Sequence, residues 1–443
     1  MLPLGPTADE ISQPVRTVLL IAFHFPPLQG SSGLQRTLRF AQYLPEFGWK
    51  PIVLTVGAPM IGRASPGTAR DSPECEVVRA PCLDVARHVA VRGHYPRFLA
   101  LPDRWASWQF AAVPIGKRLV RERRVDAVWS TYPIATAHLI GAKIARSTRV
   151  PWIADFRDPM AQDGYPPEPR QKRSFERVET IVARHAARLV FVTPSTQRLY
   201  RERFPEKRPE HFLLLENGYD DGAFERVVDT ALPRNPTPLL LHSGIVYPQE
   251  RDPEALFTAL GRLARTGSIR TGDFLLRFRA PVHSELLRTL AEQHGVTSLV
   301  DICPRIPYED ALREMVQADA LVLMQGTNCN EQIPAKLYEY LRAQKPILPL
   351  SDPVGDTGAT LAAMGYPLVT KLESVEQIMT NLPLFLDALR NDRLPVASSD
   401  EVARYSRRTL TGRFADILVS TLEHSTQHEC SSRSGGPCGQ VTP

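Results

Sequence analysis

The stretch NCNEQIPAKLYEYLRAQK, residues 328–345, decides the fold and the chemistry that the sequence predicts. Two glutamates, Glu331 and Glu339, lie eight positions apart on either side of Pro334. Proline is tolerated in the first turn of a helix, so we expect Glu331 in a loop and Glu339 in the second turn of the helix that follows. Free N–H groups at a helix start bind anions, and Lys336 adds positive charge there. The pattern predicts a cradle for a sugar nucleotide, with a phosphate between two carboxylates that bind hydroxyl groups.

Composition places the chain among ordinary folded proteins and excludes several classes. With 443 residues, of which 43% are hydrophobic, it is long enough for two or three domains. A net charge of +5 is mild at this size, and no nucleic-acid recognition motif occurs, so we expect no nucleic-acid partner. The six cysteines show no CxxC spacing, which argues against a disulfide framework and a zinc site. We expect no metal and no cofactor.

The expected localisation depends on two kinds of segment, a secretory signal and a membrane-spanning run, neither of which is recognised in the sequence. Residues 1–14 do not resemble a secretory signal, and no apolar run approaches the roughly 20 residues that span a bilayer. We therefore expect a cytoplasmic protein, at most peripheral on the inner face of the cytoplasmic membrane. The arginine-rich runs 118–124 and 170–188 are either solvated helix faces or a surface for anionic lipid. Trp105 and Trp108 are either interfacial anchors or core aromatics.

Strands and helices alternate along both halves of the chain. Residues 15–25 form a continuous apolar run typical of a buried parallel strand, and a helix and a second strand at 51–57 follow it. Residues 58–80, rich in Pro, Gly and Ser, predict an extended loop. A second alternation begins with the strand 239–244. We predict an α/β protein of two Rossmann-like, doubly wound domains facing across a cleft, with ligands at the carboxyl ends of the strands.

The predicted domain boundaries follow from the same pattern. A proline-rich linker separates an amino-terminal domain from a carboxy-terminal one, and a helix and a disordered tail come last. In order, these are the amino-terminal domain 15–230, the linker 227–238, the carboxy-terminal domain 238–400, a helix at 401–424 that packs back on the amino-terminal domain, and the tail 425–443.

Five stretches, taken together and in this order, carry a resemblance to a known family. They are FHFPPLQGSSGLQRTLRFAQYLPEFGW, HLIGAKIARSTRVPWIADFRDP, ENGYD, HSGIVYPQERDP and EQIPAKLYEYLRAQKPIL. With them the chain resembles retaining, nucleotide-sugar-dependent glycosyltransferases of the GT-B fold, in the family 4 (group 1) type that includes many bacterial envelope-polysaccharide enzymes. The resemblance implies transfer of a sugar from a nucleotide diphosphate sugar to a saccharide acceptor, expected to be lipid-linked, with retention of anomeric configuration and no metal. The partners that it implies are a nucleotide sugar, a glycan or lipid-linked acceptor, and peripheral contact with an anionic membrane.

The resemblance also implies roles for particular residues. It places Glu331 near the donor sugar and Glu339 on the ribose hydroxyls. Arg251 and Lys336 neutralise the leaving diphosphate, and His138 lies near the reacting centre of the amino-terminal domain. The residues expected to bind the donor are Gly30, Gly33, Gly244, Asn328, Pro334, Ala335, Leu337 and Glu339.

Two further residues are assigned from their position alone. Arg157 and Asp158 come directly after a predicted strand, so we expect them to line the cleft on the acceptor side, although Asp before Pro also forms turns. The histidine at 138 has a second interpretation as a packed core residue.

One departure from the family pattern keeps other functions open. The family often has arginine after the glycine that follows the first strand of the second domain, whereas Gly244 is followed here by Ile245. A cation must then come from elsewhere, and Arg279 is one candidate. The alternatives to a transferase are a sugar-nucleotide epimerase of the same architecture and a catalytically inactive scaffold that binds a sugar nucleotide.

Overall fold

The computed structural model describes residues 15–28, 32–57, 74–92, 94–227 and 236–433, which divide into two compact units. Unit 1 comprises the described residues within Met1–Phe191, Arg201–Leu213 and Thr411–Pro443. Unit 2 comprises those within Val192–Tyr200 and Leu214–Leu410. Most of the predicted linker, residues 228–235, lies outside the described part of the chain.

The first sheet, centred on β1, has the strand order β3-β2-β1-β4-β5-β6-β7, and neighbouring strands from β3 to β6 pair in parallel. The order reverses at β1, which creates the switch point where doubly wound sheets bind ligands. The strands are β1 (Arg16–Ile21), β2 (Trp49–Val56), β3 (Glu76–Ala80), β4 (Ala127–Thr131), β5 (Trp152–Phe156), β6 (Arg188–Phe191) and β7 (Phe212–Leu214).

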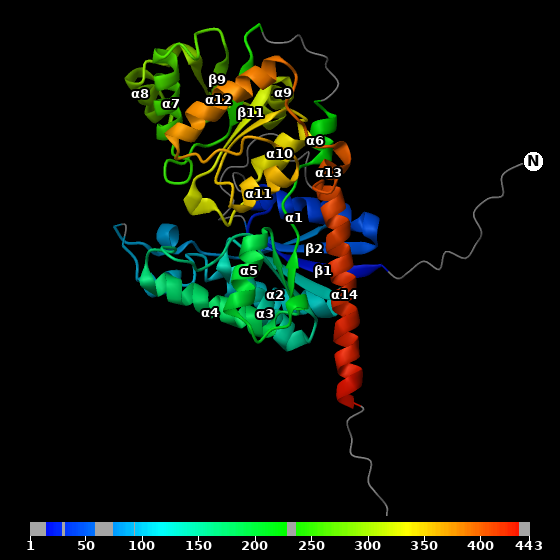
Figure 1. The fold of residues 1–443 in the computed structure, drawn as a ribbon. Coiled ribbons are helices and arrows are strands. Elements are labelled where there is room, and N and C mark those ends of the chain that lie inside the picture. The colour runs from blue at the N-terminus through cyan, green and yellow to red at the C-terminus, as the bar shows by residue number, and fades with distance from the viewer. Residues whose placement is uncertain (1–14, 29–31, 58–73, 93, 228–235, 434–443) are drawn as a thin grey trace, which may run out of the picture. The chain divides into compact units, whose positions relative to one another are not determined.

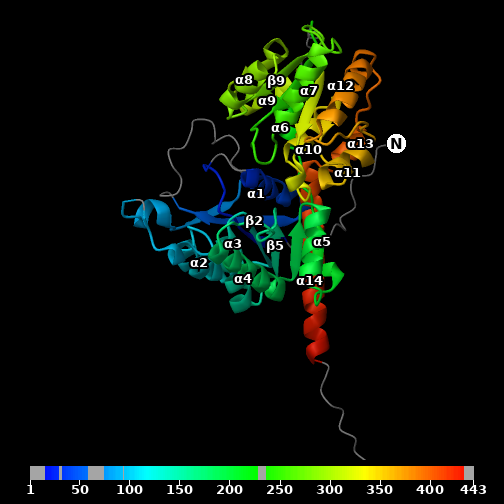
Figure 2. The same cartoon turned by 60° about the vertical axis from the view of Figure 1, so that its left-hand side comes forward.

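Helices cover both faces of this sheet, with α2, α3 and α4 on one face and α1 on the other (Figure 2). Phe40 of α1 stacks on Phe414 of α14 with ring centroids 4.5 Å apart, and Trp129 of β4 lies beside both rings. The carboxy-terminal helix therefore shares the core of unit 1. The helices are α1 (Ser32–Tyr43), α2 (Trp108–Glu122), α3 (Ala135–Thr148), α4 (Pro169–His185), α5 (Pro194–Arg203), which spans the unit boundary, and α14 (Arg407–Arg433), which begins in unit 2.

Unit 2 is built on a five-stranded sheet in the order β10-β9-β8-β11-β12, with parallel pairing throughout. Alternate residues of β8 face opposite cores: Leu240 packs with α7, α8 and α12, whereas Leu241 packs with α9 and α10. Burial on both faces explains the continuous apolar runs. The strands are β8 (Leu239–Ser243), β9 (Leu275–Arg279), β10 (Val300–Cys303), β11 (Ala320–Met324) and β12 (Ile347–Leu350).

The helices of unit 2 are shown in Figure 1. They are α6 (Asp221–Glu225), α7 (Glu254–Arg265), α8 (Ser284–Gln293), α9 (Tyr308–Gln317), α10 (Lys336–Arg342), α11 (Asp356–Ala363), α12 (Val375–Arg390) and α13 (Ser399–Ala403). Among the helices in the described part of the chain, none is long and apolar enough to cross a bilayer.

The predicted fold class is confirmed, and three local predictions were wrong. Residues 76–80, predicted as loop, form the edge strand β3, whose partly exposed residues lack the apolar run of the inner strands. The single helix predicted at 401–424 is two helices, α13 and α14, and the capping box of Ser398 and Glu401 fixes the start of α13. The predicted disordered tail begins inside α14, which continues to Arg433; residues 434–443 lie outside the described part.

Candidate functional site

The candidate donor site is the corner that follows β8. Gly244 occupies it with φ +108°, a conformation that side-chain-bearing residues rarely adopt. A Cβ atom at this position would lie 3.3 Å from Nζ of Lys336. Gly244, the glycine predicted for close approach, therefore lets the Lys336 ammonium lie against the backbone at the carboxyl end of the central strand β8.

Lys336 is held at this corner by a histidine. Its Nζ lies 3.1 Å from Nε2 of His242, while Nδ1 of the same ring lies 2.9 Å from the carbonyl oxygen of Val322. Because that carbonyl can only accept, Nδ1 carries the proton and Nε2 accepts from Lys336. Burial lowers the pKa of Lys336 well below its usual value, and the charge of Arg251 lowers it further, whereas Glu339 opposes this shift.

Arg251 supplies the second cation of the corner. Its Nη1 donates to the carbonyl oxygen of Ile245 at 3.0 Å, and its guanidinium lies 5.3 Å from the ring centroid of Tyr247. Its buried Nε has no hydrogen-bond partner among the described residues. The Arg251 guanidinium therefore lies at the backbone of Ile245, the position where the family often has arginine. Two cations and an unsatisfied donor at one glycine corner suit an anionic ligand.

Arg279, the other cation considered for this role, is engaged elsewhere. Its Nε and Nη2 donate to the two carboxylate oxygens of Glu314 at 2.8 and 2.7 Å, and its Nη1 donates to the carbonyl oxygen of Pro304. A bidentate ion pair leaves little capacity for a ligand. The suggestion that Arg279 enters the donor site is wrong.

Glu339 lies in the first turn of α10, one turn earlier than predicted, because the helix begins at Lys336. Its Oε1 accepts a hydrogen bond from the Tyr308 hydroxyl at 2.7 Å. Burial raises the pKa of Glu339, and the Tyr308 hydrogen bond, Arg407 and Lys336 oppose that shift. Tyr308 stands at the start of α9, so two loops at the carboxyl edge of the sheet converge on this carboxylate.

Glu331 lies in the loop before α10, as predicted, with an exposed side chain. The hydroxyl of Thr193, which belongs to the same unit, donates to the Glu331 carbonyl oxygen at 2.8 Å and fixes the loop. Asn328 was predicted to bind the donor, but its side-chain Nδ2 donates to the carbonyl oxygen of Gln249 at 2.6 Å. It thereby ties the loop before α10 to the loop that carries Arg251.

The helix start itself offers less than the sequence predicts. Leu337 was expected to bind the donor, but its side chain is fully buried in the core, and its N–H donates to the Pro334 carbonyl oxygen at 2.9 Å. The N–H of Tyr338 donates in the same way to Ala335. Pro334 and Ala335 lie in the turn before α10. Positive charge at this helix start therefore comes from the Lys336 side chain more than from free N–H groups.

In unit 1, polar side chains gather where β1 and β5 end. Arg157 and Asp158 follow β5, and Arg157 is close enough to His24 to act on its charge. Burial, with a smaller contribution from Arg157, lowers the pKa of His24 to about 4, so this imidazole is neutral at pH 7. Burial raises the pKa of Asp158, which Arg157 opposes. The structure brings both predicted residues to the carboxyl edge of the sheet.

A buried ion pair orders this edge. Nε and Nη2 of Arg36 on α1 donate to the two oxygens of Asp155 on β5 at 3.0 and 2.8 Å. The hydroxyl of Thr131 donates to the same carboxylate at 2.8 Å. Because these three hydrogen bonds satisfy it, the buried Asp155 carboxylate is held rigidly. Asp155 lies one residue before Phe156 and two residues before Arg157. Gly33 is buried in the first turn of α1, and Gly30 lies outside the described residues.

His138 lies in the core of unit 1, as the second interpretation of this residue predicts. Its ring is fully buried on α3, 4.9 Å from the Phe156 ring centroid. The Trp152 indole donates to the Ser130 hydroxyl at 2.8 Å, and that hydroxyl is hydrogen-bonded to Nδ1 of His138 at 2.7 Å. Burial lowers the pKa of His138 to about 3, which keeps the ring neutral. It is a core histidine.

Three residues that the sequence interpretation did not select complete the two edges. His242 is a polar residue inside the apolar run LLLHSG, and its place at the end of β8 could have identified it. His24 is likewise a polar residue near the end of an apolar run, three residues beyond the end of β1. Tyr308 carried no signal, since its contact with Glu339 joins positions 31 apart. No group of three or more His, Cys, Asp or Glu that could hold a metal ion occurs among the described residues.

Comparisons with known proteins agree with this architecture. Residues 33–218 match a family model described as a glycosyl transferase 4-like domain. A sucrose-phosphate synthase from Thermosynechococcus elongatus superposes with a TM-score of 0.59 at 13% identity, covering 95% of this chain and 100% of the other. Anabaena HepE in complex with UDP gives 0.56 at 12% identity, with coverages of 94% and 100%.

An epimerase has the same fold. The UDP-GlcNAc 2-epimerase from Neisseria meningitidis bound to UDP-GlcNAc superposes with a TM-score of 0.53 at 9% identity, covering 92% of this chain and 100% of the other. No curated protein matches the chain. The chain therefore has a GT-B fold, and its residues 33–218 match the model of the glycosyl transferase 4-like domain.

Proposed function

We propose that the protein is a glycosyltransferase that moves a sugar from a nucleotide diphosphate sugar to a saccharide acceptor. The observation that carries the proposal is the corner after β8, where Lys336 and Arg251 meet at Gly244. The partnerless Nε of Arg251 and two of the three Lys336 N–H groups are available to a diphosphate. The glycosyl transferase 4-like domain at 33–218 supports transfer as the reaction.

The leaving diphosphate is the group that this corner would stabilise. Negative charge develops on the diphosphate as the bond to the anomeric carbon breaks, and preoriented cations in a water-poor site lower the energy of that state. His242 holds the Lys336 ammonium in place before the ligand arrives, so little reorganisation is needed. Because two side chains supply the charge, the proposed reaction needs no metal.

The two glutamates take different parts of the donor in this proposal. Glu339 binds the ribose hydroxyls, since its carboxylate already accepts one O–H donor, from Tyr308. Glu331, exposed in the loop before α10, binds hydroxyls of the donor sugar. Gly33, Gly244, Pro334 and Ala335 contribute backbone close to the donor. UDP is the nucleotide to test first, because solved structures of similar fold hold UDP or a UDP-sugar.

The acceptor belongs to unit 1 in this proposal. Arg157, Asp158 and His24 present a cation, a carboxyl group and a neutral imidazole at one sheet edge. These groups suit saccharide hydroxyls, whose O–H groups both donate and accept. We propose a lipid-linked acceptor of cell-envelope polysaccharide synthesis, retention at the anomeric carbon, and a cytoplasmic protein in peripheral contact with the membrane.

A sugar-nucleotide epimerase is the second candidate, because epimerase structures superpose over more than nine-tenths of the chain. An inactive scaffold that binds a sugar nucleotide is the third, because Ile245 replaces the usual arginine. Incubation with a panel of UDP- and other nucleotide-linked sugars, with and without a bacterial lipid extract, separates the three. Nucleotide release that requires the extract supports transfer, isomerised donor without extract supports the epimerase, and binding without turnover supports the scaffold.

A further inference from the structure

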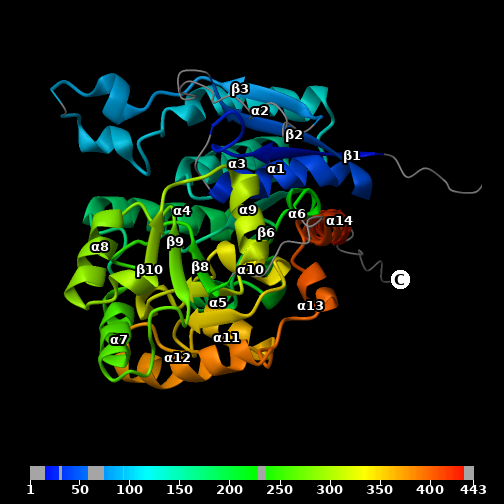
Figure 3. The ribbon, with the colours of Figure 1, turned by 90° about the horizontal axis from the view of Figure 1, so that it is seen from above.

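Apolar side chains are concentrated on the exposed surface of one segment of unit 1. The segment covers residues 82–92 and 94–110, from the end of β3 to the first turn of α2, and extends sideways from the sheet (Figure 3). It contributes 6 of the 15 large hydrophobic side chains that are exposed in the described part of the chain. Phe110 and Phe98 are 77% and 70% exposed. Single exposed apolar residues need no explanation, but a gathered set with two phenylalanines marks an interaction surface. The six are Leu83, Val89, Val91, Phe98, Leu99 and Phe110.

The charge of the same segment has one sign. Its four arginines, Arg87, Arg92, Arg97 and Arg104, are all exposed. Its acids are Asp84 and Asp103, and both are buried. Arg104 pairs with Asp84, and Arg97 lies close enough to Glu168 to act on its charge. A surface that mixes apolar and aromatic groups with an excess of arginines is complementary to an anionic bilayer, where apolar groups enter the interface and cations meet the headgroups.

One of the two arginine-rich runs singled out in the sequence is largely paired. In the run 118–124, Arg118 pairs with Glu122 and Arg123 with Glu76. Trp108 is fully buried, so the interpretation of this residue as an interfacial anchor is wrong. The segment between β3 and α2 offers what these two features do not, exposed phenylalanines together with exposed arginines.

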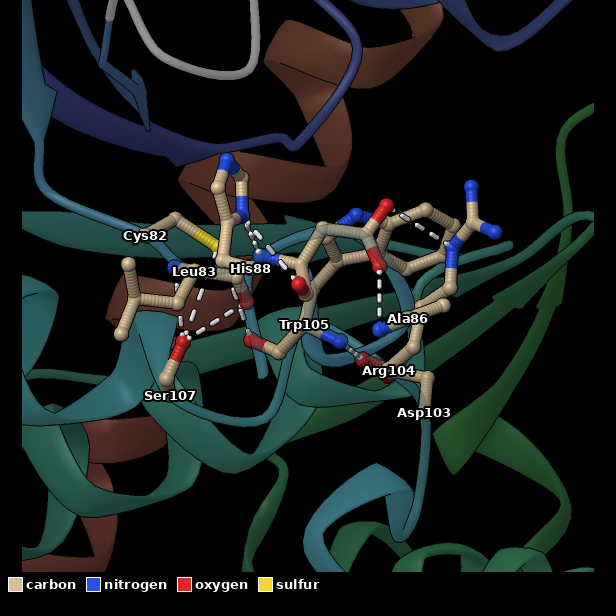
Figure 4. A network of polar contacts seen from close by, with 9 residues as sticks. Cys82, Leu83, Ala86, His88, Asp103, Arg104, Trp105 and Ser107 are labelled. Carbon is tan, nitrogen blue, oxygen red and sulfur yellow. Dashed lines mark hydrogen bonds and ion pairs between the residues drawn. The ribbon is translucent and has the colours of Figure 1, made fainter. Parts of the chain in front are cut away.

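A network of polar contacts holds the segment in shape (Figure 4). The backbone N–H of Leu83 donates to the Ser107 hydroxyl at 2.9 Å, and that hydroxyl lies 3.0 Å from the Leu83 carbonyl oxygen, which closes the base of the segment. Asp84 accepts from the N–H of Ala86 at 3.0 Å and pairs with Arg104 at 3.3 Å. These contacts fix the base of the segment, where its two ends meet, which reduces the entropy lost on docking.

The segment is also joined to the acceptor edge of unit 1. Trp105 and Trp108 lie 4.8 and 5.8 Å from the ring centroid of Phe23, the residue before His24. Asp103 accepts from the backbone N–H of Thr136 at 2.8 Å and from its hydroxyl, which fixes the start of α3. A bilayer that receives the segment would thus come next to the edge that carries His24.

We propose that this segment forms the docking surface of the protein for an anionic lipid bilayer. The proposal depends on the proposed function in one respect: docking would bring a lipid-linked acceptor to unit 1. Each arginine near an anionic surface strengthens binding by about fivefold. Replacement of three therefore weakens vesicle binding by roughly 100-fold, and loss of the phenylalanines removes the binding that persists at high salt.

The test is co-sedimentation of the full chain with vesicles of phosphatidylcholine alone or with added phosphatidylglycerol. One variant carries Arg87→Ser, Arg92→Ser and Arg97→Ser, and its matched control carries Arg262→Ser, Arg265→Ser and Arg270→Ser, three exposed arginines of unit 2. A second variant carries Phe98→Ser and Phe110→Ser, and its control is Leu384→Ser, at a position 54% exposed on α12. All are exposed positions, and thermal unfolding confirms that each variant folds.

The expected result is binding that requires phosphatidylglycerol and is retained in both controls. It is weakened roughly 100-fold in the arginine variant and no longer persists at high salt in the phenylalanine variant. Equal loss in test and control variants, or unchanged binding in the test variants, overturns the proposal. So does self-association that the phenylalanine variant abolishes while vesicle binding stays intact, since the surface would then contact a second copy. UDP-sugar affinity, measured in parallel, stays unchanged in every variant and separates failure of docking from failure of the proposed reaction.

Discussion

Replacement of Lys336 by methionine tests the donor corner most simply. Methionine keeps the length and apolar stem of lysine but removes the ammonium. In the free protein one of the three N–H groups of Lys336 is used by His242, so two are available to a diphosphate. A hydrogen bond to a charged group contributes about 2 kcal/mol. We therefore expect the affinity for a UDP-sugar to fall about 30-fold if one such bond is lost and about 900-fold if both are lost.

The substitution also leaves Nε2 of His242 buried without its donor. That orphaned acceptor costs about 1–3 kcal/mol of the free energy of unfolding, partly offset because a buried ammonium no longer has to be desolvated. Unfolding by denaturant, followed by circular dichroism, therefore accompanies the binding measurement. A modest loss of stability is expected, and it must be too small to unfold the protein at the temperature of the titration.

Isothermal titration of the full chain with a UDP-sugar measures the affinity, and Lys345→Met is the control. Lys345 lies just before β12, at the amino ends of the strands, whereas the donor corner lies at their carboxyl ends. The Lys345→Met variant is expected to bind the UDP-sugar as the native protein does. An affinity of Lys336→Met within about a factor of two of the native value, in a folded protein, would refute the assignment of Lys336 to the diphosphate.

Three further predictions concern the remaining residues. Because burial and Arg251 lower the pKa of Lys336, and only its charged form attracts a diphosphate, UDP-sugar affinity should be full below that pKa and fall as pH rises through it. Titrations at increasing pH should show this fall in the native protein and not in Lys336→Met. Glu339→Ala should weaken UDP but leave 2′,3′-dideoxy-UDP unaffected, and equal losses for the two nucleotides would contradict the ribose assignment. His138→Leu should lower the unfolding midpoint yet keep kcat, because His138 is packed in the core, whereas His24→Ala should lower kcat; a large loss of kcat in His138→Leu would restore the catalytic interpretation.

The fold was predictable because strands that are buried on both faces have a recognisable sequence pattern. Strands with both faces covered, such as β1 and β8, read as unbroken apolar runs. The edge strand β3 was missed because it carries Glu76 and Arg79 and is only half covered. The continuation of α14 to Arg433 was missed because its last turns are polar and lack the apolar period on which helix prediction relies.

The site was only partly predictable, for a reason of distance along the chain. Glu331 and Glu339 were assigned correctly to loop and helix because proline and helix spacing are local signals. The contact of Lys336 with His242 joins residues 94 apart, and no local pattern records it. For His138 the local pattern was present but pointed elsewhere. The motif around this residue resembles the family, whereas in the structure Ser130 and Trp152 enclose the ring in the core.

Proton NMR of the reaction mixture tests sugar transfer itself, since the anomeric protons of donor and product have separate signals. The protein is mixed with a UDP-sugar and a saccharide acceptor, and in a second sample with the UDP-sugar alone, and Lys336→Met serves as the impaired control. We expect that the donor signal disappears only with acceptor present, that the product keeps the anomeric configuration of the donor, and that Lys336→Met slows the change. Conversion of the donor signal to that of an isomeric UDP-sugar without acceptor would contradict the proposed transfer.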